Sequence, residues 1–193
     1  MDLFNIYNNE VPAKGNLLLS EPLLPDPNFE RTAILLCEHN DEGSFGFVLN
    51  KKAPVKLSEI MDYSSAFDDD LYLGGPVQQD TLHFIHTNAL ELEGGNEILD
   101  NVVWGGNFEQ LMAYVNNEQI QRDDIRFFLG YSGWSPGQLE EELRQNSWIL
   151  FKNVTTSMIF EEQYKESLWK EVLNQMGGKY KLFPNYPKDP NLN

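Results

Sequence analysis

The chain has 193 residues, 41% hydrophobic and 12% aromatic, which excludes a disordered polymer and is enough for a substantial core. Its 30 acidic residues against 14 basic ones give a formal net charge of −16, so we expect no specific binding to nucleic acid. A single cysteine excludes an intrachain disulfide. The first fifteen residues lack the apolar core of a signal peptide, and no apolar run is long enough to span a bilayer. These features predict a cytoplasmic protein without membrane contact.

Apolar runs predict strands that belong to one bent, largely antiparallel sheet. The strands are expected at 17–20, 33–38, 45–50, 81–87, 125–130 and 147–151, with a short one at 102–104. The turn composition of Asn40–Gly43 joins the second and third as a hairpin. Strands joined by hairpins and interrupted by helices favour an α+β fold over a doubly wound parallel sheet.

Helix signals lie between these strands. The expected helices are 57–61, 108–115 after a cap at Asn107, 136–145, and about 161–176 ended by Gly177. We expect a leader at 1–14, a single domain at 15–180 and a loosely ordered tail at 181–193, where prolines recur.

The stretch Gly130–Glu140 is the most informative local pattern. We expect a glycine-rich corner at the edge of the sheet, holding Tyr131 and Trp134, from which a helix begins at Pro136. Ser135 would be the N-cap and Gln138 would complete a capping box. The serine spacing does not match a nucleophile elbow, which needs glycine two residues after the serine.

Cys37 and His39 are the candidate catalytic residues. Two residues apart on a strand, they would share a face, and an imidazole can activate a thiolate for catalysis or redox sensing. The alternative is that Cys37 is a small buried hydrophobic residue and His39 begins the turn.

No pattern predicts a metal or a cofactor. His83 and His86 lie three apart on a strand and should face opposite sides of the sheet. The run Asp68–Asp70 lacks the spacing of a calcium loop, and we expect a solvated turn there. Gly74-Gly75-Pro76 lacks the lysine and serine or threonine of a phosphate loop.

A binding surface is the other functional hypothesis. Glycine-rich turns, polar groups and aromatics serve ligand pockets and protein contacts, and a true site would bring them to one concavity. If they scatter, they are fold-determining turns. The candidate residues are Glu38, His39, Asn40, Asn50, Gly74, Gly75, Pro76, Tyr131 and Trp134. The partner would be a protein or a small ligand, and the chain a monomer or a homodimer.

Several motifs together resemble the bacterial AlgH/YqgE family, of unknown function and often labelled as transcriptional regulators. They are Gly15–Ser20, Asp26–Thr32, Cys37–Asn40, Gly43–Asn50, Gly74–Val77 and Gly130–Glu140, with Asn146 and Trp148. The resemblance implies an α+β fold whose antiparallel strands curl into a partly open pseudo-barrel with helices outside. It implies no established reaction or cofactor. Because no basic helix-turn-helix is visible, we expect a non-catalytic binding or interaction protein without direct DNA binding.

Overall fold

The computed structural model describes residues 11–61 and 68–187 of the chain. The strands are β1 (Leu17–Ser20), β2 (Ala33–Asn40), β3 (Gly43–Val48), β4 (Lys52–Lys56), β5 (Asp70–Leu73), β6 (Val77–His86), β7 (Asn96–Leu99), β8 (Val102–Trp104), β9 (Ile125–Trp134) and β10 (Trp148–Phe151). The α-helices are α1 (Leu57–Ile60), α2 (Phe108–Asn116), α3 (Gln138–Arg144), α4 (Thr156–Phe160) and α5 (Leu168–Met176).

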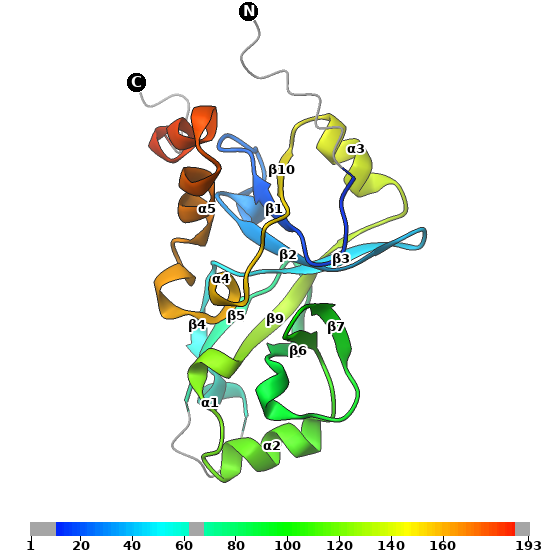
Figure 1. The fold of residues 1–193 in the computed structure, drawn as a ribbon, viewed down its shortest axis with the longest axis vertical. Coiled ribbons are helices and arrows are strands. Elements are labelled where there is room, and N and C mark those ends of the chain that lie inside the picture. Colours follow the sequence, from blue (N-terminus) through cyan, green and yellow to red (C-terminus); the bar gives the residue numbers. More distant parts are fainter. Residues whose placement is uncertain (1–10, 62–67, 188–193) are drawn as a thin grey trace, which may run out of the picture.

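The strands form one 10-stranded sheet with the order β10-β1-β2-β3-β9-β6-β8-β7, and β4 and β5 branch from it beside β9 (Figure 1). The described pairs are antiparallel except for β5 with β9. The path ends at β10 and β7 without closing into a barrel. This open, largely antiparallel sheet with flanking helices confirms the predicted α+β class, and all the predicted strands belong to it, with ends shifted by a few residues.

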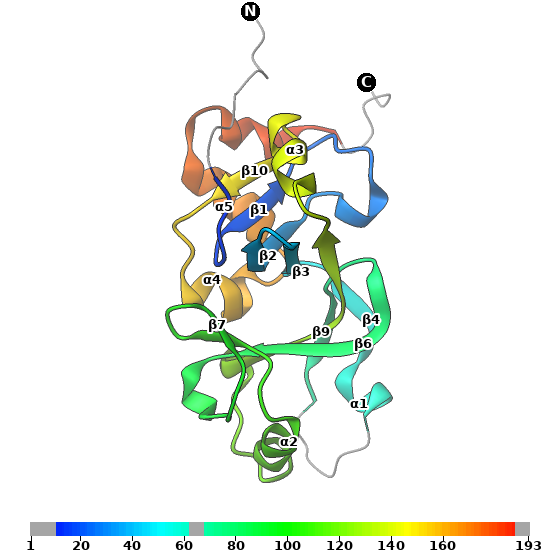
Figure 2. The same ribbon diagram turned by 90° about the vertical axis from the view of Figure 1, so that its right-hand side faces the viewer.

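The region around β1, β2 and β10 is covered on both faces. Leu17, Leu19 and Leu35 pack against α4 and α5, whereas Leu18 and Ile34 pack against α3. Figures 1 and 2 show these helices on opposite sides of the strands. Alternate side chains of a strand point to opposite faces, so a continuous apolar run is what a doubly covered strand requires.

The other end of the molecule is built around β6 and β9. In Figure 2, β6 runs across the molecule below β2 and β3, with α1 and α2 beneath it. Leu111 and Val115 of α2 pack with Phe127 of β9 and Phe84 of β6 in a separate apolar cluster. Strand β9 contributes to this cluster and also pairs with β3, so it joins the two ends of the molecule.

The expected corner at Gly130 is wrong in two respects. Strand β9 continues to Trp134, pairing with β3 through Ser44, and it lies inside the sheet rather than at its edge. Helix α3 begins at Gln138, two residues later than predicted, because Gly137 adopts a left-handed conformation (φ 78°) that interrupts a helix. The Gln138 side chain does accept a hydrogen bond from the backbone N–H of Ser135, at 3.0 Å.

The predicted single helix over 161–176 is also wrong. Within this segment a 3-10 turn at Glu162–Tyr164 is followed by α5, which begins only at Leu168. The separate helix α4 ends just before the segment, because Glu161 has an extended backbone (ψ 138°). Thr155 caps α4 through the N–H of Met158. Gly177 ends α5 as predicted, with φ 75°.

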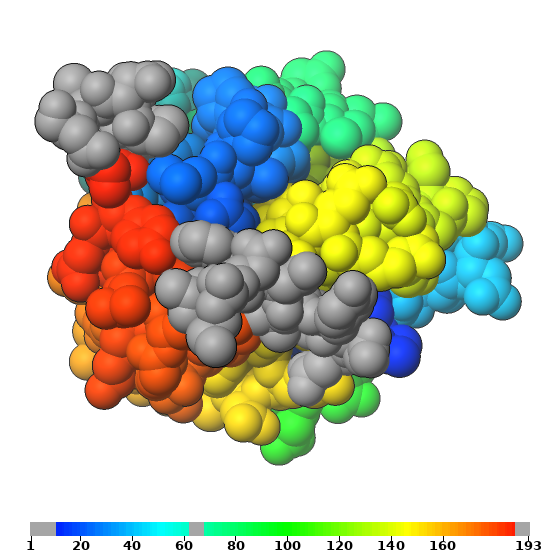
Figure 3. Space-filling view, turned by 90° about the horizontal axis from the view of Figure 1, so that it is seen from above, coloured from blue at the N-terminus to red at the C-terminus, as the bar shows by residue number. Residues whose placement is uncertain are grey.

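As far as residue 187, where the described part ends, the segment that follows α5 is ordered, whereas loose order was expected from residue 181 onward. A 3-10 helix spans Gly178–Asn185, Phe183 is buried, and the carbonyl of Tyr186 accepts a hydrogen bond from Arg31. In Figure 3 this segment (red) lies beside amino-terminal residues (blue), and the light-blue region of the β2–β3 hairpin protrudes at the opposite side. Most of the predicted leader, 1–10, and the last residues, 188–193, lie outside the described residues. No helix in the described ranges is long and apolar enough to cross a membrane.

Candidate functional site

A cavity of about 640 Å³ lies beside the turn of the protruding β2–β3 hairpin. Its walls come from both strands of the hairpin, from β6, β8 and β9, and from the turn at Ser135 and Pro136. Ligand pockets in proteins are commonly of this size, about 300–1,000 Å³. The sheet topology therefore brings together segments far apart in sequence to form one concavity.

Half-buried aromatic side chains form the apolar wall of the cavity. The rings of Phe45 and Trp104 have centroids 4.8 Å apart at 64°, and those of Phe45 and Tyr131 are 6.2 Å apart at 83°. Behind them, Phe47 is fully buried and stacks on Phe128 at 4.8 Å. Edge-to-face packing against one another and against the core holds these half-buried rings in position.

The rim of the cavity is acidic. Exposed Glu38 and Glu42 line it together with Asn40. The amide of Asn40 donates to Glu38 Oε1 at 2.7 Å, and its Oδ1 accepts from the N–H of Glu42 at 2.8 Å. Asn40 thus holds the turn and one carboxylate in place. None of the described lining residues is Lys or Arg.

Cys37 and His39 do not share a face, contrary to the prediction. A β-bulge between Leu36 and Glu38 leaves Cys37 without a partner on β3, which shifts the alternation of the residues that follow. Cys37 packs into the core beneath α5, whereas His39 meets α3 on the opposite face through Glu140, 3.6 Å away. The geometry does not form a thiol–imidazole pair.

The surroundings of Cys37 also favour the structural alternative. The thiol is buried and donates a weak hydrogen bond to the carbonyl of Leu35 at 3.6 Å. Burial raises the pKa of this thiol well above its ordinary range, which keeps it protonated and poorly nucleophilic. The other candidate, His39, has its Nδ1 within 2.7 Å of the Ser44 hydroxyl, an interaction that steadies the hairpin.

Trp134 lines the cavity only at its margin, since it is 7% exposed. Its indole N–H donates to Glu142 at 2.8 Å, and the indole N–H of Trp148 donates to the same carboxylate oxygen at 2.7 Å. The two rings pack edge to face. Trp134 therefore anchors α3 to the sheet and supports the cavity from behind.

The remaining predicted site residues lie outside the cavity. Asn50 accepts from the N–H of Ala33 and donates to the carbonyl of Arg31, so it fastens the start of β2. A Cβ on Gly74 would lie 2.3 Å from the carbonyl oxygen of Gly130, and one on Gly75 2.2 Å from Tyr131 backbone atoms. These glycines permit β5 to approach β9 closely. Exposed Pro76, which follows them, is not among the lining residues.

The convergence prediction is thus met for only part of the set. Glu38, Asn40, Tyr131 and Trp134 line the cavity, and His39 contacts it through Ser44. Other lining residues were not among the candidates, and these include the rim residue Glu42 and the wall residues Phe45, Val77, His83 and Trp104. The alternation Phe45-Gly46-Phe47 was a usable signal, because it places two rings on one face of a strand beside a residue without a side chain.

His83 lines the cavity, but His86 does not. The His83 ring packs on Phe47 and Tyr131, and its Nε2 has no hydrogen-bond partner in the described part of the chain. Burial lowers the pKa of His83 below its ordinary value, which favours the neutral ring. His86 packs beside Phe84 on the other face, which confirms the predicted opposite orientation. Within 11–61 and 68–187, no three His, Cys, Asp or Glu side chains gather in a metal-binding arrangement.

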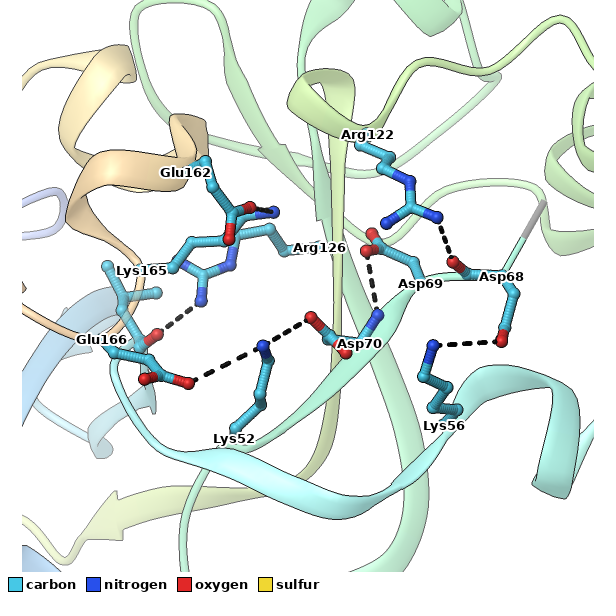
Figure 4. Close-up of polar contacts among 11 residues, drawn as sticks. Lys52, Lys56, Asp68, Asp69, Asp70, Arg122, Arg126, Glu162, Lys165 and Glu166 are labelled. Atoms are coloured by element: carbon cyan, nitrogen blue, oxygen red, sulfur yellow. Dashed lines mark hydrogen bonds and ion pairs between the residues drawn. The ribbon is translucent and has the colours of Figure 1, made fainter.

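A second cluster, which was not predicted, surrounds Arg126, and Figure 4 shows its charged residues. The guanidinium of Arg126, 1% exposed, lies 3.9 Å from the centre of the Tyr72 ring. It donates to the carbonyl of Ile159 at 2.7 Å and to that of Leu49. Burial lowers the pKa of Arg126 to about 10, so it stays charged at neutral pH. This arginine ties β9 to α4 and to the end of β3.

Around Arg126, other charges are paired at the surface or just below it. Lys165 contacts Glu162 at 2.9 Å, and Lys52 lies between Asp70 at 2.8 Å and Glu166 at 3.7 Å (Figure 4). The expected solvated turn at Asp68–Asp70 is wrong for Asp69, which is 3% exposed and whose pKa burial raises. This cluster connects β4, β5 and β9 with α4 and the segment that follows it.

Comparisons with known proteins agree with this architecture. A family model described as AlgH-like matches residues 17–181. A UPF0301 protein of Cytophaga hutchinsonii is 45% identical over 181 residues, covering 93% of this chain and 98% of that relative. A UPF0301 protein of Chlorobium limicola is 44% identical over 179 residues, covering 93% and 95%.

Two solved structures share the fold. The solution structure of the AlgH protein from Pseudomonas aeruginosa matches with a TM-score of 0.71 at 27% identity, over 93% of this chain and 98% of that one. The crystal structure of protein DIP2367 from Corynebacterium diphtheriae matches with a TM-score of 0.73 at 22% identity, over 95% and 97%. By its family model and its relatives, the chain belongs to the AlgH-like family, as its motifs predicted.

Proposed function

We propose that this protein is a non-catalytic binding protein that takes a small ligand into the cavity beside the turn of the β2–β3 hairpin. The observation that carries the proposal is the half-buried aromatic wall of Phe45, Trp104 and Tyr131 around a cavity of about 640 Å³. Apolar walls with a few placed polar groups are the usual composition of ligand sites. Here the polar groups are Glu38, Glu42 and Asn40 at the rim.

Support for binding rather than covalent catalysis comes from the nucleophiles. Cys37, the free cysteine of the described chain, is buried outside the cavity with a raised thiol pKa. His39 contacts Ser44 and Glu140 and lies on the opposite face from Cys37. A pair that activates a nucleophile needs the base within hydrogen-bond reach, and this geometry gives the alternative of a Cys37–His39 enzyme or redox sensor no support.

The test is a screen of aromatic and aliphatic fragments against the isotope-labelled protein by two-dimensional amide NMR. We expect binders to shift the amide signals of residues 38–45 and 131–135. Tyr131→Ala should weaken binding, because it removes one wall, whereas Phe108→Ala, which removes an exposed ring on α2, should leave binding unchanged. Shifts confined to other surfaces, or no binders at all, would contradict the proposal.

Binding to duplex DNA is not part of this proposal. The net charge is −16, and the cavity rim is acidic, so phosphates are repelled rather than neutralised. We expect no sequence-selective complex at the affinities of specific regulators, about 10⁻⁸ M or tighter. Gel-shift titration with genomic and random duplexes at moderate salt checks this, and a selective, salt-sensitive shift would refute it.

A further inference from the structure

We propose that the ligand of this cavity carries an organic cation, an alkylammonium group joined to an apolar part, held by the aromatic wall and the acidic rim. The proposal rests on the cavity being a ligand site, and it specifies the chemistry that the site selects. Three independent features of the described residues carry it: the orientation of the rings, the sign of the rim charge, and the absence of a lining cation.

The rings provide more than one surface suited to a cation. The Phe45 ring stands at 64° to Trp104 and at 83° to Tyr131, so the three rings form walls that meet steeply. The face of an aromatic ring carries negative electrostatic potential, and cations bind over it, most strongly over tryptophan. A compact cation in the cavity can lie over a ring face of this aromatic wall.

The rim adds charge of the matching sign. Glu38 and Glu42 both line the cavity, and the Asn40 amide holds the Glu38 carboxylate by a 2.7 Å hydrogen bond. A cation in the cavity gains from both carboxylates, while an anion would meet them without a compensating charge. Exposed carboxylates contribute modestly, so the rim selects the sign of the ligand and the rings supply most of the affinity.

The chain does not fill this cavity with a cation of its own. No Lys or Arg is among the described residues that line it, and the histidine there, His83, is in the part of the wall backed by Phe47. Elsewhere the same chain does place a cation on rings, since Arg126 lies over Tyr72 and Phe128. The cavity therefore has aromatic rings and carboxylates that suit a cation, and we infer that the cation comes from a ligand.

The experiment uses three soluble probes of nearly the same shape and different charge: phenethylammonium, 2-phenylethanol and 3-phenylpropionate. Each is titrated at pH 7 into the labelled wild-type chain, and the shifts of residues 38–45 and 131–135 give the dissociation constants. We expect the cation to bind about tenfold more tightly than the alcohol, the gain of a partly desolvated cation–π contact. The anion should bind no better than the alcohol.

Variants separate the rings from the rim. Phe45→Leu keeps an apolar side chain but removes a ring, so it should weaken the cation several-fold and change the alcohol little, and Phe45→Tyr should restore the cation's affinity. Glu42→Gln should weaken only the cation, by roughly twofold. Glu118→Gln, an exposed carboxylate just beyond α2, is the matched control and should change nothing.

The outcomes distinguish this inference from the proposed function. Binding of the alcohol or the anion in the cavity as tightly as the cation overturns the cation proposal and leaves the ligand site standing. Failure of all three probes to shift the cavity signals overturns both. Shifts by the cation that Phe45→Leu leaves unchanged also overturn the proposal, because the rings would then not be its binding surface.

Discussion

The molecule contains two aromatic clusters that differ in what occupies them. In the interior, Tyr72 and Phe128 are covered by the guanidinium of Arg126, which is bound to backbone carbonyls and sealed by α4. Beside the turn of the hairpin, Phe45, Trp104 and Tyr131 are half-buried around an open cavity with an acidic rim. In the interior, the contact between rings and a cation stabilises the fold, because the cation is the chain's own arginine. At the cavity, the rings have no arginine or lysine among the described lining residues, so they are available to bind a ligand.

The largest expected effect on stability comes from comparing two phenylalanines on β3. Phe47 is fully buried and stacked on Phe128, whereas Phe45 is half exposed in the cavity wall. Phe47→Ala should lower the free energy of unfolding by about 3–5 kcal/mol, because it leaves a core cavity. Phe45→Ala should lower it by only about 1 kcal/mol. Urea denaturation measures both, and equal losses would mean that Phe45 belongs to the core rather than to a site.

Arg126→Met tests the closed cluster directly. The substitution keeps much of the side-chain volume but leaves the carbonyls of Ile159 and Leu49 without their donor, so we expect a loss of roughly 3 kcal/mol. Arg122→Met is the control, since Arg122 is exposed and should cost well under about 1 kcal/mol. Were the two variants equally stable, the guanidinium would not be holding β9 to α4.

Glu142→Leu tests the support behind the open cluster. It removes the shared acceptor of Trp134 and Trp148, and we expect unfolding to become easier by about 2 kcal/mol, with a changed near-ultraviolet circular dichroism signal from the indoles. Glu141→Leu alters an exposed neighbour on the same helix and should have a much smaller effect. Identical spectra for the two variants would argue against the anchoring role of Glu142.

The smallest effect concerns pH. Because burial holds the pKa of His83 below its ordinary value of 6.5, the unfolded chain takes up a proton there before the folded chain does. Stability from this residue should therefore decline as pH falls below about 6.5 and level off below the folded pKa. His83→Phe should make the decline shallower in denaturation curves between neutral and mildly acidic pH. An unchanged slope would contradict the buried, neutral state of His83.

The strands were predictable, and the helix ends less so, for physical reasons. Continuous apolar runs such as Leu17–Leu19 are visible in sequence because both faces of the strand are covered. The start of α3 was predicted two residues too early because proline is common both in turns and at the first position of a helix. Gly137, with its left-handed backbone, keeps Pro136 in the turn. The interruption between the 3-10 turn at Glu162–Tyr164 and α5 contains no proline or glycine that would mark it in the sequence.

The candidate site was only partly predictable because it depends on pairing between distant strands. The hairpin turn and Tyr131 were found, since their composition is unusual locally. The bulge at Cys37 is defined by pairing with β3, so the sequence of β2 alone does not reveal it. It places the side chains of Cys37 and His39 on opposite faces of the sheet. Trp104 joins Phe45 only because β8 pairs with β6 and β3 pairs with β9.

The most direct measurement of the contrast between the two clusters is the set of intermolecular nuclear Overhauser effects from bound phenethylammonium. We predict contacts from the methylene next to the ammonium to the rings of Phe45, Trp104 and Tyr131, and none to Tyr72 or Phe128, whose faces Arg126 occupies. Contacts to the interior rings, or a bound probe with its ammonium group turned away from the cavity rings, would contradict the account.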